Sequence, residues 1–383
     1  MKLKTIILSL IFLATFAAKA ICKDSLMFHN VSHRIMAEIR PTYNLPTHGY
    51  YNGFNEANEP IHMGGAVHLK YGFTLSPDSK LGQLYPTSYQ GIGIGAQSFL
   101  HHSMTGTPLM LYVFQGSPLV DLGKSVTIGY EWNLGASYGW KINDVVSSRW
   151  NIYINVGIPV TWNITPTWAL SIAPEYTHFS NGDTSFPNGG ANTVGCRIGV
   201  TAKINEEQEI KAPGKELFAK EEYFVKSTAK DRMSYDLTIS AGWRADRTFA
   251  ENTLHIINKP FVTSGVCFNP LYKFNRYFSA GPALDILYDS SADLEITDGQ
   301  ITYPKATRQL SAGLSARGEL TMAFFAVNIG AGYGFSHGND LRGFYTTYAL
   351  KTFITDSLFI NVGYRLSSVL YSHNLMFGVG VRL

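Results

Sequence analysis

Residues 125–138 read SVTIGYEWNLGASY, and the alternation in this stretch decides the fold. Its apolar positions are Val126, Ile128, Tyr130, Trp132 and Leu134, and the positions between them are Thr127, Gly129, Glu131 and Asn133. Successive side chains of a strand point to opposite faces, so one face is apolar and the other is polar. This is the lipid-outward, lumen-inward pattern of a membrane β-barrel wall. Glu131 is then expected inside the barrel, paired with Arg or Lys in a structural role.

The composition agrees with a barrel wall. The chain has 383 residues with 23 Phe, 22 Tyr and 36 Gly, whereas charged residues make up only 15%. A soluble secreted protein of this length would carry more charge. The net charge of +3 and the lack of a basic cluster argue against a nucleic-acid partner. The three cysteines are odd in number and far apart, so they predict no disulfide framework.

Similar runs recur along the chain, separated by turn residues. In the first half, strands are expected at 32–40, 63–75, 89–100, 108–115, 125–138, 150–162, 167–180 and 192–203. In the second half they are expected at 234–246, 260–271, 275–288, 307–319, 320–333, 343–354, 356–370 and 374–383. The prediction is an all-β, transmembrane antiparallel barrel protein, with about eight strands in the first half and about sixteen in total. Closure as one large barrel and closure as an eight-stranded barrel plus a second unit both fit this pattern.

The N-terminus predicts export from the cytoplasm. Lys2 and Lys4 precede an apolar run over 5–17, and 18–20 reads Ala-Lys-Ala, an A-x-A cleavage site. We therefore expect residues 1–20 to be a signal peptide.

The rest of the chain divides into two halves around a charged segment. Residues 21–205 form the first predicted barrel half, 206–232 a charged linker, and 233–383 a second half. The second half reads as a degenerate copy of the first, because ITPTWALSI at 164–172 is matched by ITDSLFINV at 354–362. At that offset of 190 residues, His178 corresponds to Ser368 and Ser180 to Leu370, so only the first copy keeps the pair of polar residues described next.

Strand parity singles out one polar group on the outward face. On the strand over 167–180 the even positions are apolar, and His178 and Ser180 have the same parity. Asn192, on the following strand, falls on the outward face beside them. Polar side chains at the lipid-facing rim are costly unless they are hydrogen-bonded or used. A serine becomes a nucleophile when a histidine takes its proton, and the histidine needs an orienting partner. The outward placement predicts a lipid substrate.

The motif His178-x-Ser180-Asn181 followed by 187–190, Pro-Asn-Gly-Gly, resembles the signature of the PagL-type lipid A 3-O-deacylases. The resemblance covers roughly residues 25–205. It implies an eight-stranded outer-membrane barrel of a Gram-negative bacterium that hydrolyses an ester-linked acyl chain of lipopolysaccharide.

The resemblance also implies roles for individual residues. His178 would be the general base and Ser180 the nucleophile. Backbone groups of Asn181 and Gly182, supported by Asn188, would stabilise the oxyanion. The departure is Asn192, which stands where the family has a glutamate. An amide oxygen can orient a histidine, but it cannot stabilise the imidazolium as a carboxylate does.

Two function classes follow from this sequence. The first is an esterase acting on lipid A without a metal or other cofactor, in which Ser180, His178 and Asn192 form the catalytic group. The second is a barrel without enzymatic activity, either porin-like or catalytically degenerate. The histidines outside the motif have no metal-ligand spacing. Oligomeric state and the acyl position that is cut do not follow from the sequence.

Overall fold

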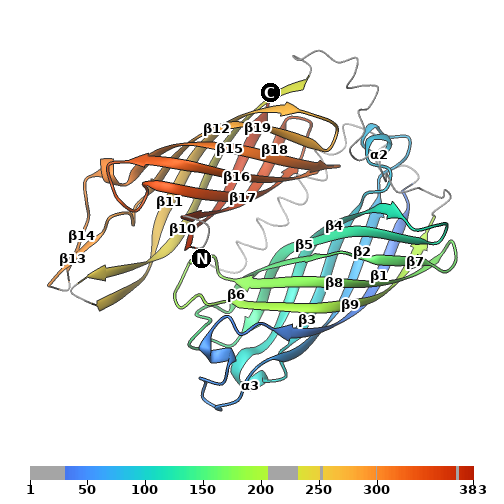
Figure 1. Cartoon of the computed structure of the whole chain (residues 1–383), viewed down its shortest axis with the longest axis horizontal. Coiled ribbons are helices and arrows are strands. Elements are labelled where there is room, and N and C mark those ends of the chain that lie inside the picture. The colour runs from blue at the N-terminus through green and yellow to red at the C-terminus, as the bar shows by residue number, and fades with distance from the viewer. Residues whose placement is uncertain (1–30, 206–231, 251–252, 299, 368–370) are drawn as a thin grey trace, which may run out of the picture.

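The computed structural model describes residues 31–205, 232–250, 253–298, 300–367 and 371–383. These residues form two closed antiparallel barrels that lie side by side (Figure 1). Among them, no helix is long and apolar enough to cross a bilayer. The predicted signal peptide and nearly all of the predicted linker lie outside the described residues.

The first barrel has eight strand positions around its wall, here called staves, and one of them is divided into two short strands. Its strands are β1 (His33–Asn44), β2 (Met63–Thr74), β3 (Tyr89–Ser98), β4 (Gly106–Asp121), β5 (Val126–Trp140), β6 (Trp150–Gly157), β7 (Val160–Asn163), β8 (Trp168–Ser180) and β9 (Ala191–Ile204). Strands β6 and β7 both lie between β5 and β8, and β1 pairs with β9 to close the ring. Short helices lie in the connections: η2 (Gly49–Tyr51), α2 (Lys80–Leu84) and α3 (His102–Thr105).

The second barrel also has eight staves. They are β10 (Met233–Ala250), β11 (Thr253–Lys273), β12 (Phe278–Asp289), β15 (Leu310–Met322), β16 (Phe325–Ser336), β17 (Gly343–Phe353), β18 (Leu358–Ser367) and β19 (Tyr371–Arg382). A small hairpin of β13 (Glu295–Thr297) and β14 (Gln300–Thr302), followed by η5 (Ala306–Arg308), lies between β12 and β15. The all-β fold is confirmed, and the sixteen staves close as two barrels. Strands β8 and β9 are the last two strands of the first barrel, as β18 and β19 are of the second, and the internal repeat stays a prediction. The predicted counterparts of the motif, residues 368 and 370, lie outside the described residues.

The alternation read from the sequence sets the two faces of the wall. On β8, Leu170 and Ile172 are exposed on the outside, whereas Ala173 and Glu175 are buried inside. An exposed apolar band of this kind is what lipid contacts.

Ion pairs fill the first lumen. Glu131, buried on β5, lies 2.6 Å from the Nζ of Lys70 and also pairs with Arg197. Glu38 pairs with both cations and with Arg40. A buried carboxylate that loses its partners is strongly destabilising. Glu131 therefore holds three staves together, as predicted, and takes no part in an outward-facing site.

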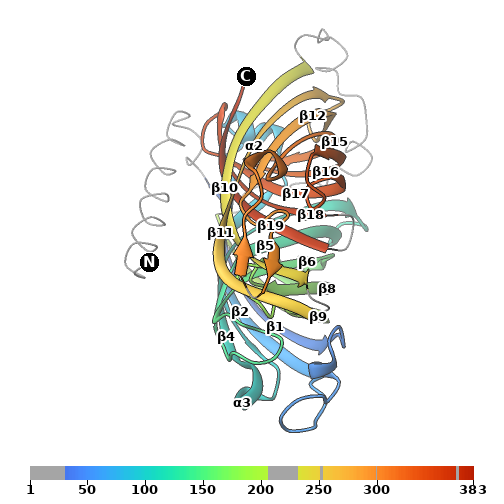
Figure 2. The same cartoon turned by 90° about the vertical axis from the view of Figure 1, so that its left-hand side faces the viewer.

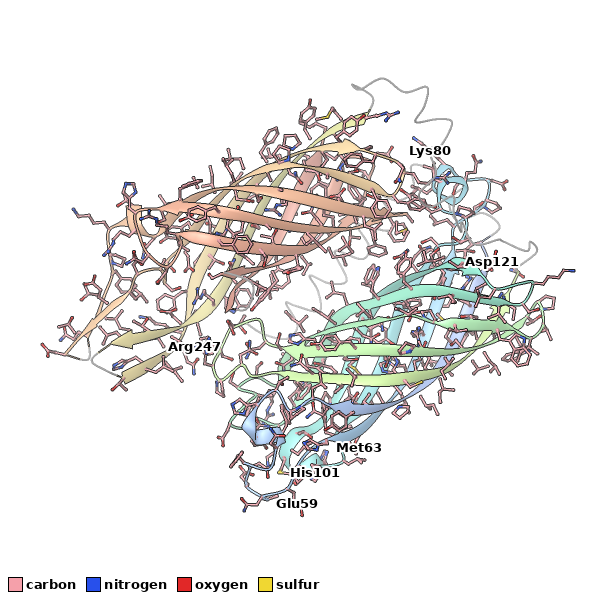
Figure 3. All side chains as sticks on the ribbon, in the orientation of Figure 1. Glu59, Met63, Lys80, His101, Asp121 and Arg247 are labelled. Atoms are coloured by element: carbon pink, nitrogen blue, oxygen red, sulfur yellow. The ribbon has the colours of Figure 1, made fainter. Side chains whose placement is uncertain are left out.

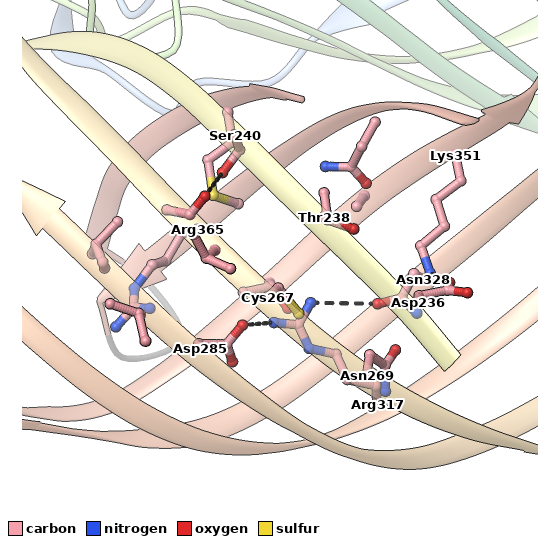
Figure 4. A pocket seen from close by; sticks show the side chains of 18 residues that line it. Asp236, Thr238, Ser240, Cys267, Asn269, Asp285, Arg317, Asn328, Lys351 and Arg365 are labelled. Atoms are coloured by element: carbon pink, nitrogen blue, oxygen red, sulfur yellow. Dashed lines mark hydrogen bonds and ion pairs between the residues drawn. The ribbon is translucent and has the colours of Figure 1, made fainter. Parts of the chain in front are cut away.

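A second ionic cluster fills the other lumen. Asp285 and Arg317 are joined at 2.6 Å between Oδ1 and Nη2 (Figure 4). Lys351 bridges Asp236 and Glu319, at 2.6 Å from each. Each barrel therefore has its own core and its own closed ladder.

The two barrels touch at one end through apolar side chains. Leu75 and Tyr85 of the first barrel pack with Tyr277, Met322 and Ala323 of the second. The Tyr85 hydroxyl also donates to the backbone carbonyl of Arg276 at 2.9 Å. Figure 3 places Lys80 at this end, with Glu59, His101 and Arg247 at the opposite end. The opposite end carries the longer loops, which in outer-membrane barrels are extracellular.

Candidate active site

The register of β8 and β9 brings the three predicted side chains together at the long-loop end. His178 lies directly across the ladder from Asn192, and Ser180 follows two residues later on the same face. On the other side of β8, Ile154 and Ile152 of β6 stand opposite His178 and Ser180. All three polar side chains are half-buried on the outward face.

The imidazole of His178 is hydrogen-bonded on both sides. Its Nδ1 lies 2.7 Å from the Oδ1 of Asn192, and its Nε2 lies 2.9 Å from the Oγ of Ser180. The Oδ1 of Asn192 also accepts a hydrogen bond from the Tyr176 hydroxyl at 2.6 Å. Since an amide oxygen only accepts, the imidazole proton belongs on Nδ1. The lone pair of Nε2 then faces the hydroxyl of Ser180, which is the tautomer that a general base needs.

Two contacts around Asn192 did not follow from the sequence. The hydroxyl of Tyr176 donates to the Oδ1 of Asn192. The Nδ2 of Asn192 lies 3.3 Å from the Oγ1 of Thr47, in the loop after β1. Tyr176 shares the parity of His178 two residues earlier, so its position on this face could have been read from the pattern. Thr47 lies 145 residues from Asn192, and no local signal links them.

An aromatic core inside the barrel fixes the end of β8. Phe179 points inward between the two motif residues and packs on Trp140 and Tyr153, with ring centroids 5.0 and 5.4 Å apart. Tyr51, buried in η2, donates from its hydroxyl to the carbonyl oxygen of Gly190 at 2.7 Å. The long-loop end is therefore plugged from within, and the outward pair rests on a packed support.

The loop between β8 and β9 is held by two asparagines. The side chain of Asn188 accepts from the backbone N–H of Asn181 at 3.0 Å and donates to a carboxylate oxygen of Asp183 at 2.7 Å. Asn181 in turn donates to the carbonyl of Ser185 at 2.9 Å. Gly182 and Asp183 have φ of +67° and +60°, so the chain turns sharply just after Ser180.

Two carboxylates lie close to His178 in the sequence, and each has another partner in the structure. Asp183 accepts a hydrogen bond from Asn188, and Glu175 points into the lumen, 3.5 Å from the Nη1 of Arg40. Burial of Asp183 raises the pKa of its carboxyl above the usual value, although Asn188, Arg244 and Arg247 each lower that pKa. The orienting group that touches His178 is therefore an uncharged amide.

The described residues contain no group of three or more His, Cys, Asp or Glu placed to hold a metal ion. Cys196 and Cys267 are unbridged. The glycine-rich run at 91–95 lies within β3, as a barrel stave.

The chain is similar to two family models. Residues 43–201 match the model described as lipid A 3-O-deacylase (PagL). Residues 233–383 match the model described as acyloxyacyl hydrolase, C-terminal domain. Together the two models span most of the chain, and each lies within one barrel. No curated protein matches the chain.

Three solved structures show distant likenesses to this chain. Neisserial surface protein A is 10% identical, with 46% of this chain and 97% of that chain covered and a TM-score of 0.30. CdiB from Acinetobacter baumannii is 9% identical, with 93% and 60% covered and a TM-score of 0.20. Omp33 from Acinetobacter baumannii is 7% identical, with 92% and 98% covered and a TM-score of 0.16. Scores this low carry no argument about this chain.

The family assignment is therefore based on the two sequence models. Two barrels with apolar outer walls are the fold expected of a protein in the outer membrane of a Gram-negative bacterium. This chain belongs to the family of PagL-type lipid A 3-O-deacylases.

Proposed function

We propose that the first barrel is an esterase that removes an ester-linked acyl chain from lipid A by a serine–histidine mechanism. The observation that carries the proposal is the position of Nε2 of His178, 2.9 Å from the hydroxyl of Ser180, with Nδ1 bonded to Asn192. Family membership supports a hydrolase acting on lipid A esters.

The reaction follows from these contacts. The Oγ of Ser180 attacks the carbonyl carbon of the acyl ester while Nε2 of His178 takes its proton. The tetrahedral intermediate expels the sugar alkoxide, which receives that proton from His178. Water then attacks the acyl-serine, with His178 again as the base, and the fatty acid is released. The bond between the acyl carbon and the sugar oxygen is broken. It is replaced first by a bond from the acyl carbon to Oγ of Ser180 and then by a bond to the oxygen of water.

The oxyanion requires a donor near Ser180. Asn181 is not free for this task, because its N–H is donated to Asn188. We assign the role to the N–H of Gly182, which stands next in the turn. Asn181 and Asn188 then act by holding that turn. One oxyanion donor contributes about 10²–10³-fold in kcat.

Placement on the outer wall supports a lipid substrate. Ser180 lies on the face that meets the membrane, at the end with the longer loops. A lipid of the outer leaflet reaches it by lateral diffusion, without entering the plugged lumen.

The test is mass spectrometry of lipid A from cells that express the wild type, Ser180→Ala or Ser171→Ala. Ser171 lies on the same strand but on the lumen side, so it is a matched control. We expect a loss of one acyl chain with the wild type and Ser171→Ala, and intact lipid A with Ser180→Ala. Identical acylation in all three, with each protein folded in the membrane, would reject the esterase and favour a barrel without enzymatic activity.

A further inference from the structure

The long hairpin of β10 and β11 carries a large irregularity near the first barrel. Arg244 pairs with Phe261, but the next paired residue, Asp246, stands opposite Ile257. Ala245 of β10 therefore faces three residues of β11, 258–260. A bulge of this kind interrupts the ladder and redirects backbone and side-chain groups, and bulges are frequent beside active sites.

The groups released by this bulge bind the loop that follows Ser180. The backbone N–H of Ala245 donates to the carbonyl oxygen of Asp183 at 2.8 Å. The side chain of Asn258 accepts from the N–H of Phe186 at 2.7 Å and donates to its carbonyl oxygen at 2.8 Å. Asn258 thus makes both hydrogen bonds of a β-bridge with one residue of the other barrel.

Two further contacts come from the second barrel. The guanidinium of Arg247 lies over the ring of Phe186, 4.6 Å from its centroid. Leu375 of β19 lies so close to Gly182 that a Cβ added to this glycine would be 3.3 Å from the Cβ of Leu375. Figures 1 and 2 show the β10–β11 hairpin reaching beyond its own barrel toward the first.

These contacts connect to Ser180 through the loop itself. Asp183, held by Ala245, accepts from Asn188, and Asn188 accepts from the N–H of Asn181, the neighbour of Ser180. A connection of this length has many conformations, and fixing its backbone from outside removes that freedom before substrate binds.

We infer that the second barrel is part of the active site, and that Asn258 is a positioning residue that holds the catalytic loop through the backbone of Phe186. This inference rests on the function proposed above. It gives the second barrel a role in the reaction although the motif lies entirely on the first.

The contacts between the second barrel and the loop after Ser180 could serve only to hold the two barrels together. Two observations argue against this explanation. The barrels already adhere at the other end through the apolar cluster around Tyr85 and Tyr277. Three of the contacts at the loop are directed hydrogen bonds to backbone atoms of Asp183 and Phe186, and such bonds fix conformation rather than add apolar burial.

The experiment compares Asn258→Ala, Asn258→Asp and the control Asn339→Ala in the full chain. Asn339 is an exposed asparagine in the loop after β16 of the same barrel. The readouts are kcat and KM for acyl release, and hydrogen exchange of the Phe186 amide. Asn258→Ala removes both hydrogen bonds to Phe186. We expect it to lower kcat by about tenfold, because the loss of one neutral hydrogen bond already accounts for a change of about this size. We also expect faster hydrogen exchange at the Phe186 amide. Asn258→Asp keeps the acceptor for the N–H, so its effects should be smaller, and KM should stay unchanged in both.

The outcomes separate this inference from the proposed function. If the wild type releases no fatty acid but Asn258→Ala speeds exchange at Phe186, the docking of the loop stands and the esterase proposal fails. If the wild type is active and Asn258→Ala matches Asn339→Ala in kcat, the positioning role is overturned, whatever happens to exchange. Unchanged exchange at Phe186 overturns it as well.

Discussion

His178 and Asn192 face one another across the β8–β9 ladder, and their Nδ1 and Oδ1 atoms are 2.7 Å apart. The contact fixes the ring and its tautomer without supplying a charge. In the proposed mechanism, a carboxylate at this place would also stabilise the imidazolium that forms when Ser180 loses its proton. These residues thus have the geometry that the proposed mechanism requires, without the charge that would stabilise the imidazolium.

Replacing Asn192 separates geometry from charge. Asn192→Asp is nearly isosteric, so we expect it to keep the contact with His178 and to raise kcat about tenfold, since a neighbouring carboxylate raises a histidine pKa by about one unit or more. Asn192→Leu should lower kcat, because the ring loses its partner. Steady-state release of fatty acid measures both. Equal rates for the wild type and Asn192→Asp would show that charge at this position does not limit the reaction.

Tyr176 should act through Asn192. Its hydroxyl donates to the same oxygen that binds His178, so Tyr176→Phe leaves that oxygen freer to turn away. The expected loss in kcat is about two- to tenfold, the worth of one neutral hydrogen bond. Tyr138→Phe, which changes an exposed tyrosine on β5, is the control. An undiminished kcat in Tyr176→Phe would mean that the Thr47 contact alone orients Asn192.

Gly190 meets a steric limit at the end of the loop. Its φ is +60°, and a Cβ there would lie 2.3 Å from the carbonyl oxygen of Phe179. Gly190→Ala must therefore shift the end of β8, and we expect it to abolish activity and lower stability by about 1–3 kcal/mol. Gly123→Ala is a matched control, because Gly123 also has positive φ, +90°, but has nothing within 4 Å. Similar losses in both variants would contradict a steric cause.

The sequence could predict the walls because alternation is a local property. Parity placed Glu131 and Glu175 inside and His178 outside, since one apolar face per strand leaves a single choice of register. The pairing of His178 with Asn192 followed from parity together with the motif. The number of barrels could not be predicted, because a stave looks the same in a barrel of eight or of sixteen.

Contacts between distant segments left no pattern to read. The loop residue Tyr51 belongs to the aromatic core around Phe179, but loops have no periodicity that would mark their residues as buried. The bulge at Ala245 depends on pairing with β11, and Asn258 meets Phe186 across 72 residues. Such features appear only when the barrels are built.

Glu131 provides a test of the first barrel's stability. It is buried and pairs with Lys70 and Arg197. Glu131→Gln leaves both cations without that charge, which should cost about 3–5 kcal/mol, seen as a lower urea midpoint in detergent. Glu59→Gln, at an exposed loop position, should leave the midpoint unchanged. The kcat of folded Glu131→Gln should match the wild type, because Glu131 faces away from Ser180. A large fall in kcat at unchanged stability would contradict a purely structural role.

Asp183 should make stability depend on pH in a definite direction. Burial raises the pKa of its carboxyl in the folded protein above the ordinary value of 3.8. The folded state therefore binds a proton more tightly than the unfolded state. It follows that the free energy of unfolding falls as pH rises through the interval from 3.8 to the raised folded pKa.

Asp183→Asn has no such proton and can still accept from Asn188. Its unfolding free energy should thus equal that of the wild type at the acid side of this interval and exceed it on the alkaline side. Urea titrations of both proteins at several pH values measure the difference, and two curves that stay parallel throughout would contradict a raised pKa at Asp183.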